Sequence, residues 1–164
     1  MSTSILNQPT KKALALNLGL FILIQVIISC LVFGLGWDKG HNSAFVKKPY
    51  VVPSGALVGG VWLALYFLMS YARWYLNKYS DVQSQAIKKL ITNLLIWCSL
   101  YPFYTFAIDS AYGGIVGNTG IFVISLFIIV KSWKFDSKVS LLILPVLLWI
   151  TFASTIIFSE LGIF

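Results

Sequence analysis

The chain has 164 residues, of which 59% are hydrophobic and only 10% are charged. A soluble domain usually carries about 25% charged residues, and so few charges cannot cover the surface of a water-soluble domain of this size. The composition therefore excludes an ordinary soluble globule and indicates a membrane protein.

Five stretches without acidic or basic residues follow one another along the chain. They are 13–37, 49–72, 90–108, 110–130 and 139–159, each 19 to 25 residues long. A helix that rises about 1.5 Å per residue needs about 20 apolar residues to cross a hydrocarbon core of about 30 Å. Each stretch therefore predicts one transmembrane helix, because the continuous apolar runs lack the alternation of barrel strands.

We expect an all-α membrane protein that forms a bundle of five transmembrane helices. The chain is a single domain, 1–164, with helices at about 13–36, 54–76, 87–108, 115–133 and 139–160. A polar tail, residues 1–10, precedes the first helix. The segment 37–53 is the one long connection, and loops of this length in compact proteins are usually functional or disordered.

Basic residues predict the orientation of the chain in the membrane. If successive loops alternate sides, one side carries nine basic residues and the other three. The nine are Lys11, Lys12, Arg73, Lys78, Lys88, Lys89, Lys131, Lys134 and Lys138, and the three are Lys39, Lys47 and Lys48. Positive charge is enriched in cytoplasmic loops, so we expect a cytoplasmic N-terminus and an outside C-terminus. The net charge of +7 then indicates contact with membrane lipid, not nucleic acid.

No arrangement of catalytic or metal-ligating residues is visible in the sequence. The two cysteines, Cys30 and Cys98, have no ligand neighbour at metal-binding spacing, and there is one histidine. We therefore expect no catalytic residue, no metal and no required cofactor.

Aromatic residues in the second and third helices recur at helical spacing. Trp62, Tyr66, Met69 and Arg73 form one stripe, and Asn93, Trp97, Tyr101 and Tyr104 form another. Helix packing explains such stripes, and so does an aromatic-lined cavity for a flat apolar ligand. Gln25 and Asn93 favour the cavity, because uncharged polar groups in a membrane usually face the bundle interior.

Two segments of the chain carry a family resemblance. The first matches a K-P-x-W-T-P-P loop end and a G-P-V-W-x-x-L-Y-x-x-M-G-Y-A helix at Lys48, Pro49, Pro53, Gly59, Val61, Trp62, Leu65, Tyr66, Met69, Tyr71 and Ala72. The second matches L-L-x-P-Y-x-x-W-x-x-F-A at Leu141, Leu142, Pro145, Trp149, Phe152 and Ala153. Together they resemble the TspO/MBR family of tryptophan-rich sensory or translocator proteins. Departures at Val51, Ser54 and Gly60 mark a divergent member.

The resemblance implies a membrane protein that binds tetrapyrroles, such as porphyrin or haem, or sterol-like molecules, beneath the first loop. Carried over by position, the ligand-binding residues are Trp62, Tyr66, Trp149 and Ala153. Asn93 and Trp97 are added from the third helix, which is similar to the family's L-N-x-x-W stretch with the Trp one place late. The lid loop contributes Lys48, Pro49 and Pro53. Trp faces would stack on the macrocycle, and Tyr66 and Asn93 would offer hydrogen bonds.

Three classes of function remain open at this point. The first is a receptor, carrier or sensor for tetrapyrroles. The second is an enzyme-like role in which bound porphyrin is degraded in light, and the third is a structural or assembly protein whose aromatics only pack.

A homodimer is also expected, because the family often dimerises and Gly55 with Gly59, and Gly113 with Gly117, have GxxxG spacing.

Overall fold

A computed structural model describes residues 4–36, 53–103, 105 and 110–160. Five α-helices follow one another within this part of the chain. They are α1 (Lys11–Gly34), α2 (Gly55–Tyr75), α3 (Val82–Pro102), α4 (Ser110–Trp133) and α5 (Ser137–Glu160). Two short 3₁₀ helices, η1 (Ile5–Asn7) and η3 (Leu76–Lys78), precede α1 and follow α2. The described residues contain no strand, as the sequence predicts.

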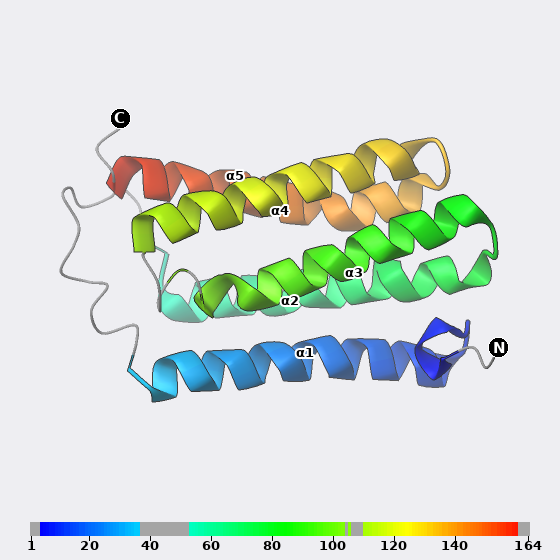
Figure 1. Ribbon diagram of the computed structural model, residues 1–164, viewed down its shortest axis with the longest axis horizontal. Coiled ribbons are helices and arrows are strands. Elements are labelled where there is room, and N and C mark those ends of the chain that lie inside the picture. The colour runs from blue at the N-terminus through cyan, green and yellow to red at the C-terminus, as the bar shows by residue number, and fades with distance from the viewer. Residues whose placement is uncertain (1–3, 37–52, 104, 106–109, 161–164) are drawn as a thin grey trace.

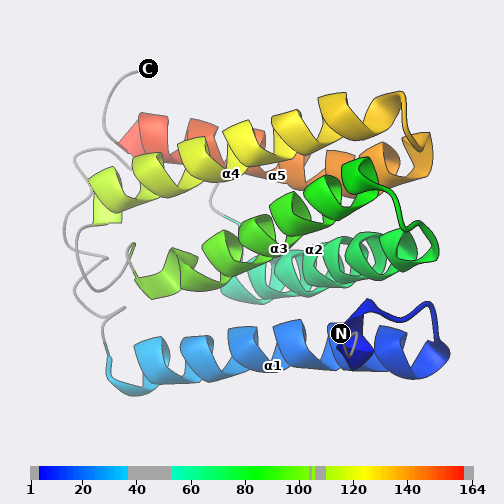
Figure 2. The ribbon, with the colours of Figure 1, turned by 45° about the vertical axis from the view of Figure 1, so that its right-hand side comes forward.

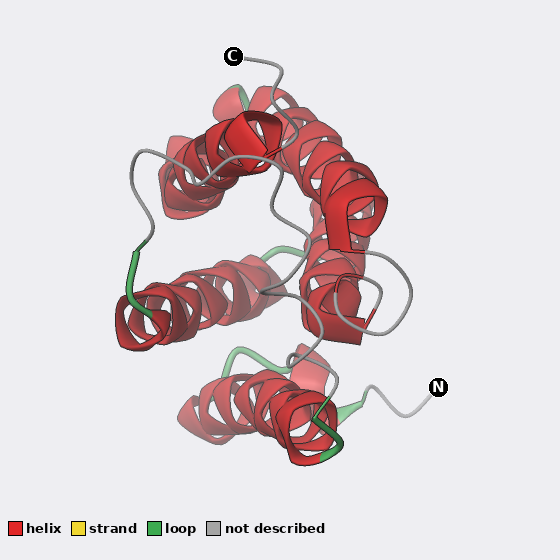
Figure 3. Cartoon of the chain, turned by 90° about the vertical axis from the view of Figure 1, so that its left-hand side faces the viewer, coloured by secondary structure: helices red, strands yellow, loops and turns green. Residues whose placement is uncertain are grey.

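The helices pack lengthwise in three layers. Figures 1 and 2 show α1 alone at one edge, α2 and α3 beside it, and α4 with α5 beyond them. The view along the bundle in Figure 3 shows the same order, with α1 nearest the N-terminus at the edge. The connections α2 to α3 and α4 to α5 lie at the same end as the start of α1 (Figure 1).

Local capping explains where three of the helices begin. The side chains of Thr10, Ser54 and Asp81 accept hydrogen bonds from backbone N–H groups three residues later, at 3.2, 3.3 and 2.9 Å. Each of these N–H groups lacks an intrahelical acceptor.

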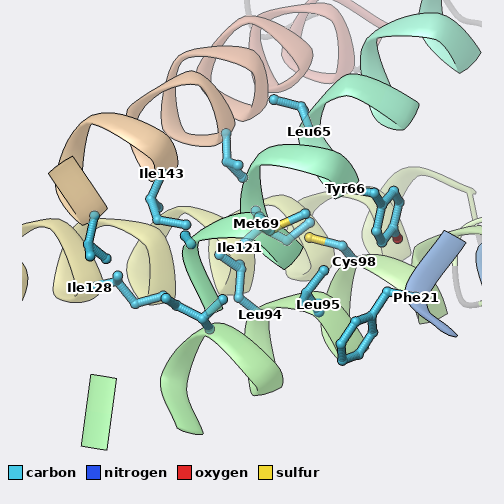
Figure 4. Packing of buried hydrophobic residues seen from close by; sticks show 14 of the residues in the cluster. Phe21, Leu65, Tyr66, Met69, Leu94, Leu95, Cys98, Ile121, Ile128 and Ile143 are labelled. Atoms are coloured by element: carbon cyan, nitrogen blue, oxygen red, sulfur yellow. The ribbon is translucent and has the colours of Figure 1, made fainter. Parts of the chain in front are cut away.

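One hydrophobic core joins all five helices. It contains Phe21 of α1, Tyr66 and Met69 of α2, and residues of α3, α4 and α5 such as Leu95, Ile121 and Ile143 (Figure 4). The outward faces carry large exposed apolar side chains, for example Leu23, Leu63 and Leu148. An outer surface of exposed apolar side chains suits contact with lipid and not with water.

Four of the described helices are long and apolar enough to cross a membrane. They are Lys11–Gly34, Gly55–Lys78, Tyr112–Trp133 and Ser137–Ser159. The helix α3 is outside this group, because it includes Gln83, Gln85, Lys88, Lys89 and Asn93. Within the described residues the number of α-helices is the predicted five, and the length and apolarity of the helices support four of the five predicted spans.

The third helix begins earlier than predicted. It spans Val82–Pro102, whereas the sequence predicts about 87–108, and residues 104 and 106–109 lie outside the described part of the chain. Asp81 caps the helix before its two lysines, so Lys88 and Lys89 lie inside it. A charge-free stretch marks apolar residues and not the hydrogen-bonded start of a helix.

The glycine pairs have different surroundings. Gly55 and Gly59 of α2 are exposed, with no other atom within 4 Å of where a Cβ would lie. Gly117 of α4 is instead buried, and its carbonyl accepts a hydrogen bond from Trp97 Nε1 at 3.2 Å. The second GxxxG pair thus contributes to packing within the chain, and the homodimer stays a prediction.

Candidate aromatic binding site

Three aromatic rings from α2 and α3 meet in the half of the bundle away from the N-terminus. The Trp62 ring centroid lies 6.1 Å from that of Tyr66, one turn later, and 6.1 Å from that of Tyr101. Tyr66 is completely buried, whereas Trp62 and Tyr101 are half-buried and pack against the core. The α2 stripe therefore faces the bundle interior, as its spacing predicts.

Hydrogen-bonded polar side chains surround the hydroxyl group of Tyr66. The Tyr66 hydroxyl donates to Gln25 Oε1 of α1 at 2.9 Å, and its oxygen lies 3.3 Å from Ser99 Oγ of α3. Ser99 donates in turn to the Leu95 carbonyl, and Gln25 Nε2 donates to Ser29 Oγ at 3.1 Å. A buried phenol needs such partners. Gln25 thus faces the interior, as expected from its polarity.

The α5 candidates lie on the neighbouring part of the core. Trp149 and Ala153 are half-buried and pack against the same core cluster. The Trp149 ring lies 5.6 Å from that of Phe152. Its Nε1 is buried and has no hydrogen-bond partner within the described residues. A buried N–H without an acceptor is unfavourable, so this indole can donate to a ligand.

The two α3 candidates lie apart from this cluster. Asn93 is exposed. Trp97 is 36% exposed, and its ring crosses to α4, where a Cβ added at Gly120 would lie 2.7 Å from it. The structure therefore brings Trp62 and Tyr66 together, leaves Asn93 exposed, and packs the Trp97 ring against α4.

The lid residues fall largely outside the described chain. Lys48 and Pro49 belong to 37–52, which the structure does not describe. Pro53 is half-buried and comes just before Ser54, the N-cap of α2.

A groove elsewhere on the bundle is not made of the predicted site residues. It has a volume of about 330 Å³ and lies between α2 and α5, lined by Tyr71, Tyr75, Lys138, Leu141 and Leu142. These residues belong to the end of α2 and the start of α5, so the groove is far along the bundle from Trp62.

The sequence does not indicate that Tyr101 and Ser99 lie beside Trp62 and Tyr66. Tyr101 was recognised in a stripe but not as a neighbour of Trp62, and Ser99 gave no signal because a lone serine in an apolar helix is common. In the part of the chain that is described, no group of three or more His, Cys, Asp or Glu side chains could hold a metal ion. The residues of the aromatic cluster and Trp149 offer ring faces and hydrogen-bonding groups.

Comparison with known proteins gives two matches. The model of the TspO/MBR family matches residues 21–160. A tryptophan-rich protein TspO from Archaeoglobus fulgidus is 33% identical over 121 residues, which are 71% of this chain and 75% of that relative. Both findings confirm the resemblance predicted from the loop and helix motifs.

Proposed function

The chain belongs to the TspO/MBR family, and from that premise we propose that it binds tetrapyrroles, such as porphyrin or haem, and similar flat apolar ligands. As an integral, multi-pass membrane protein, it would hold them among α1, α2, α3 and α5. The observation that carries the proposal is the interior aromatic cluster, in which Trp62 contacts both Tyr66 and Tyr101.

The proposed binding mode uses properties of the individual side chains. Trp62 offers an indole face for stacking, and offset stacking adds about 1 kcal/mol beyond simple burial. Trp149 offers a buried N–H without an acceptor in the described part of the chain. Ala153 is small and half-buried on the same helix, so it leaves space for the edge of a planar ligand.

The proposed topology includes α3 as a fifth span. Its last ten residues are mainly apolar, and its core positions are completely buried at Ile91, Leu94 and Leu95. It packs against α1, α2 and α4, which are all candidate spans. A helix in that position shares the membrane with its neighbours.

The test is a porphyrin titration followed by Trp fluorescence in the dark. We expect saturable quenching by the parent protein, and about tenfold weaker binding for Trp62→Leu and for Trp149→Leu, which is about 1.4 kcal/mol each. Leu keeps each position apolar and suits a membrane helix. The matched control is Trp133→Leu, because Trp133 is 59% exposed at the end of α4.

Two outcomes would change the conclusion. If both interior variants bind porphyrin as tightly as the parent, the aromatic cluster only packs and the binding proposal is wrong. If the bound porphyrin loses its absorption bands under illumination and a product forms, the protein degrades its ligand as well as binding it.

A further inference from the structure

A buried arginine lies at the end of the bundle covered by the N-terminal segment, residues 4–10. Arg73 of α2 is only 9% exposed. Its Nε donates to Thr92 Oγ1 at 2.8 Å, its Nη1 to Asn17 Oδ1, and its Nη2 to Asn7 Oδ1 at 3.4 Å. The guanidinium also lies 5.9 Å from the centre of the Phe21 ring. All three acceptors are uncharged.

A buried lysine from α3 lies beside it. Lys88 is 6% exposed, and its Nζ donates to Asn77 Oδ1 at 3.2 Å. Thr92, which accepts from Arg73, donates to the Lys88 carbonyl at 2.9 Å. A chain of hydrogen bonds also joins the two cations, from Arg73 through Asn17, the Leu6 carbonyl and Asn77 to Lys88.

The N-terminal segment completes this group with backbone carbonyls. The Leu6 carbonyl accepts from both Asn17 Nδ2 and Asn77 Nδ2 at 2.9 Å, and the Gln8 carbonyl accepts from Asn77 at 3.1 Å. These bonds turn the two asparagine side-chain oxygens toward the cations. The polar tail predicted from the sequence is thus a structured part of the bundle.

No carboxylate balances these charges in the described residues. Asp81 is exposed and caps α3. Asp136 binds Tyr79 and lies 3.6 Å from Lys78. The other acidic residues come, in sequence, next to the opposite helix ends: Asp38 after α1, Asp109 before α4 and Glu160 at the end of α5. Buried charges are normally paired, but the described part of the chain supplies no counter-ion for these two.

We propose that Arg73 and Lys88 form a binding site for one phosphate group, carried by an anionic phospholipid or present as free phosphate. Lys88 has three N–H donors and uses one on Asn77, and Arg73 has five and uses three in the contacts above. The remaining donors can bind the oxygens of a phosphate, which accepts several charge-assisted hydrogen bonds at once.

Asn7 marks the side from which a phosphate oxygen reaches the site. Its bond to Arg73 is longer than the bond from Thr92, and Asn7 itself is exposed. A phosphate oxygen can therefore replace the Asn7 oxygen without disturbing the bonds to Thr92 and Asn17. The site is also near the end of α2 and the start of α3, the depth at which lipid headgroups lie.

The proposal is independent of the tetrapyrrole site. Trp62 precedes Arg73 by eleven residues of α2, which is about 16 Å along the helix. Loss of porphyrin binding and loss of phosphate binding are therefore separable in variants.

The test has two arms on the purified full-length protein in dodecyl maltoside. In the first, inorganic phosphate is titrated at constant ionic strength and binding is measured by calorimetry. In the second, native mass spectrometry measures how strongly phosphatidylglycerol is retained relative to phosphatidylcholine. We expect saturable phosphate binding that weakens at least tenfold in Lys88→Gln and persists in Lys88→Arg. The matched control is Lys89→Gln, the same charge change at the exposed neighbouring residue.

Each outcome has a defined meaning. Preferential retention of phosphatidylglycerol that is lost in Lys88→Gln identifies a lipid headgroup, and phosphate binding without lipid preference identifies the free anion. The proposal is wrong if neither probe binds saturably, or if Lys89→Gln weakens binding as much as Lys88→Gln. Arg73→Gln gives a second test if circular dichroism shows that the variant keeps the helicity of the parent. If it does not, the result for Lys88→Gln is decisive, because that change removes a single side-chain hydrogen bond. Asn7→Ala separates binding from packing, because it should leave phosphate affinity unchanged or higher.

Discussion

At the scale of single residues, the Tyr66 hydroxyl ties three helices together. It donates to Gln25 of α1 from a completely buried ring on α2, and it lies beside Ser99 of α3. Tyr66→Phe keeps the ring but leaves the Gln25 oxygen without this donor. We expect the free energy of unfolding to fall by about 1 kcal/mol, measured by thermal denaturation in detergent with circular dichroism. An unchanged midpoint would mean that water already satisfies Gln25.

Asp136, in the turn between α4 and α5, gives the protein a predictable response to acid. Burial alone would raise the pKa of this carboxyl, but the Tyr79 hydroxyl at 2.8 Å and the Lys138 backbone N–H at 3.0 Å outweigh it and lower the pKa. A group whose pKa is lower in the folded state stabilises the fold above its unfolded pKa, about 3.9. That stabilisation is lost as the pH falls through the folded value.

The expected result is a comparison of two pH profiles. The thermal midpoint of the parent should fall between pH 6 and pH 3, while Asp136→Asn should start lower at pH 6 and fall less. Asp81 also has a lowered pKa, because the Ser84 backbone N–H donates to it. Since Asp81 acts in both proteins, the difference between the profiles isolates Asp136. Parallel profiles would show that the turn contributes no acid sensitivity.

At the scale of helices, the close approach of α3 and α4 depends on a glycine. A Cβ at Gly120 would lie 2.7–2.8 Å from three atoms of the Trp97 ring. Gly120→Ala should therefore displace the indole, and overpacking of this kind costs about 1–3 kcal/mol. The matched control is Gly19→Ala in α1, where a Cβ meets nothing within 4 Å and alanine favours the helix.

The two substitutions should shift the thermal midpoint in opposite directions. Gly120→Ala should lower it and also change Trp fluorescence, because Trp97 loses its bond to the Gly117 carbonyl. Gly19→Ala should leave it unchanged or raise it. Equal effects would indicate that Trp97 moves aside without cost.

Helix bounds show which local signals are dependable. The sequence predicts the second helix at 54–76, and it is observed at Gly55–Tyr75. The two starts agree because Ser54 is the N-cap of this helix. The third begins earlier than predicted, because Asp81 caps it, and the buried side-chain oxygen of Asn77 accepts a hydrogen bond from Lys88. The lysine can then remain inside the helix. A charge count along the chain cannot detect such a partner, since the partner comes from another element.

At the scale of the whole molecule, the bundle gathers its basic residues at one end. The described side chains from Lys11, Arg73, Lys88, Lys131 and Lys138 come from the helix ends that meet there (Figure 1). Positive charge favours the cytoplasmic side. We therefore predict that this end, with the N-terminus, lies in the cytoplasm.

A membrane-impermeant thiol reagent tests the orientation. In a Cys30→Ser background, added from outside, it should label a cysteine placed at Ser43 and miss cysteines placed at Ser4 and Ser80, which are exposed. Ser84 is unsuitable because it is buried. Labelling of Ser4→Cys and Ser80→Cys but not of Ser43→Cys would reverse the assignment.

The sequence by itself determined the class of the protein, its number of helices and its family. These follow from local properties: long apolar stretches, basic residues between them, and motifs around Trp62 and Trp149. It also identified the α2 stripe correctly, because helical spacing fixes which residues share a face.

Only the tertiary structure decided which faces meet. It leaves Asn93 exposed and packs Trp97 against α4, although both residues have the same helical spacing as the interior stripe of α2. It also packs the N-terminal segment against Asn17 and Asn77. The rotation of a helix about its axis depends on its neighbours, and hydrogen bonds between residues as distant as Leu6 and Asn77 leave no periodic signal in the sequence.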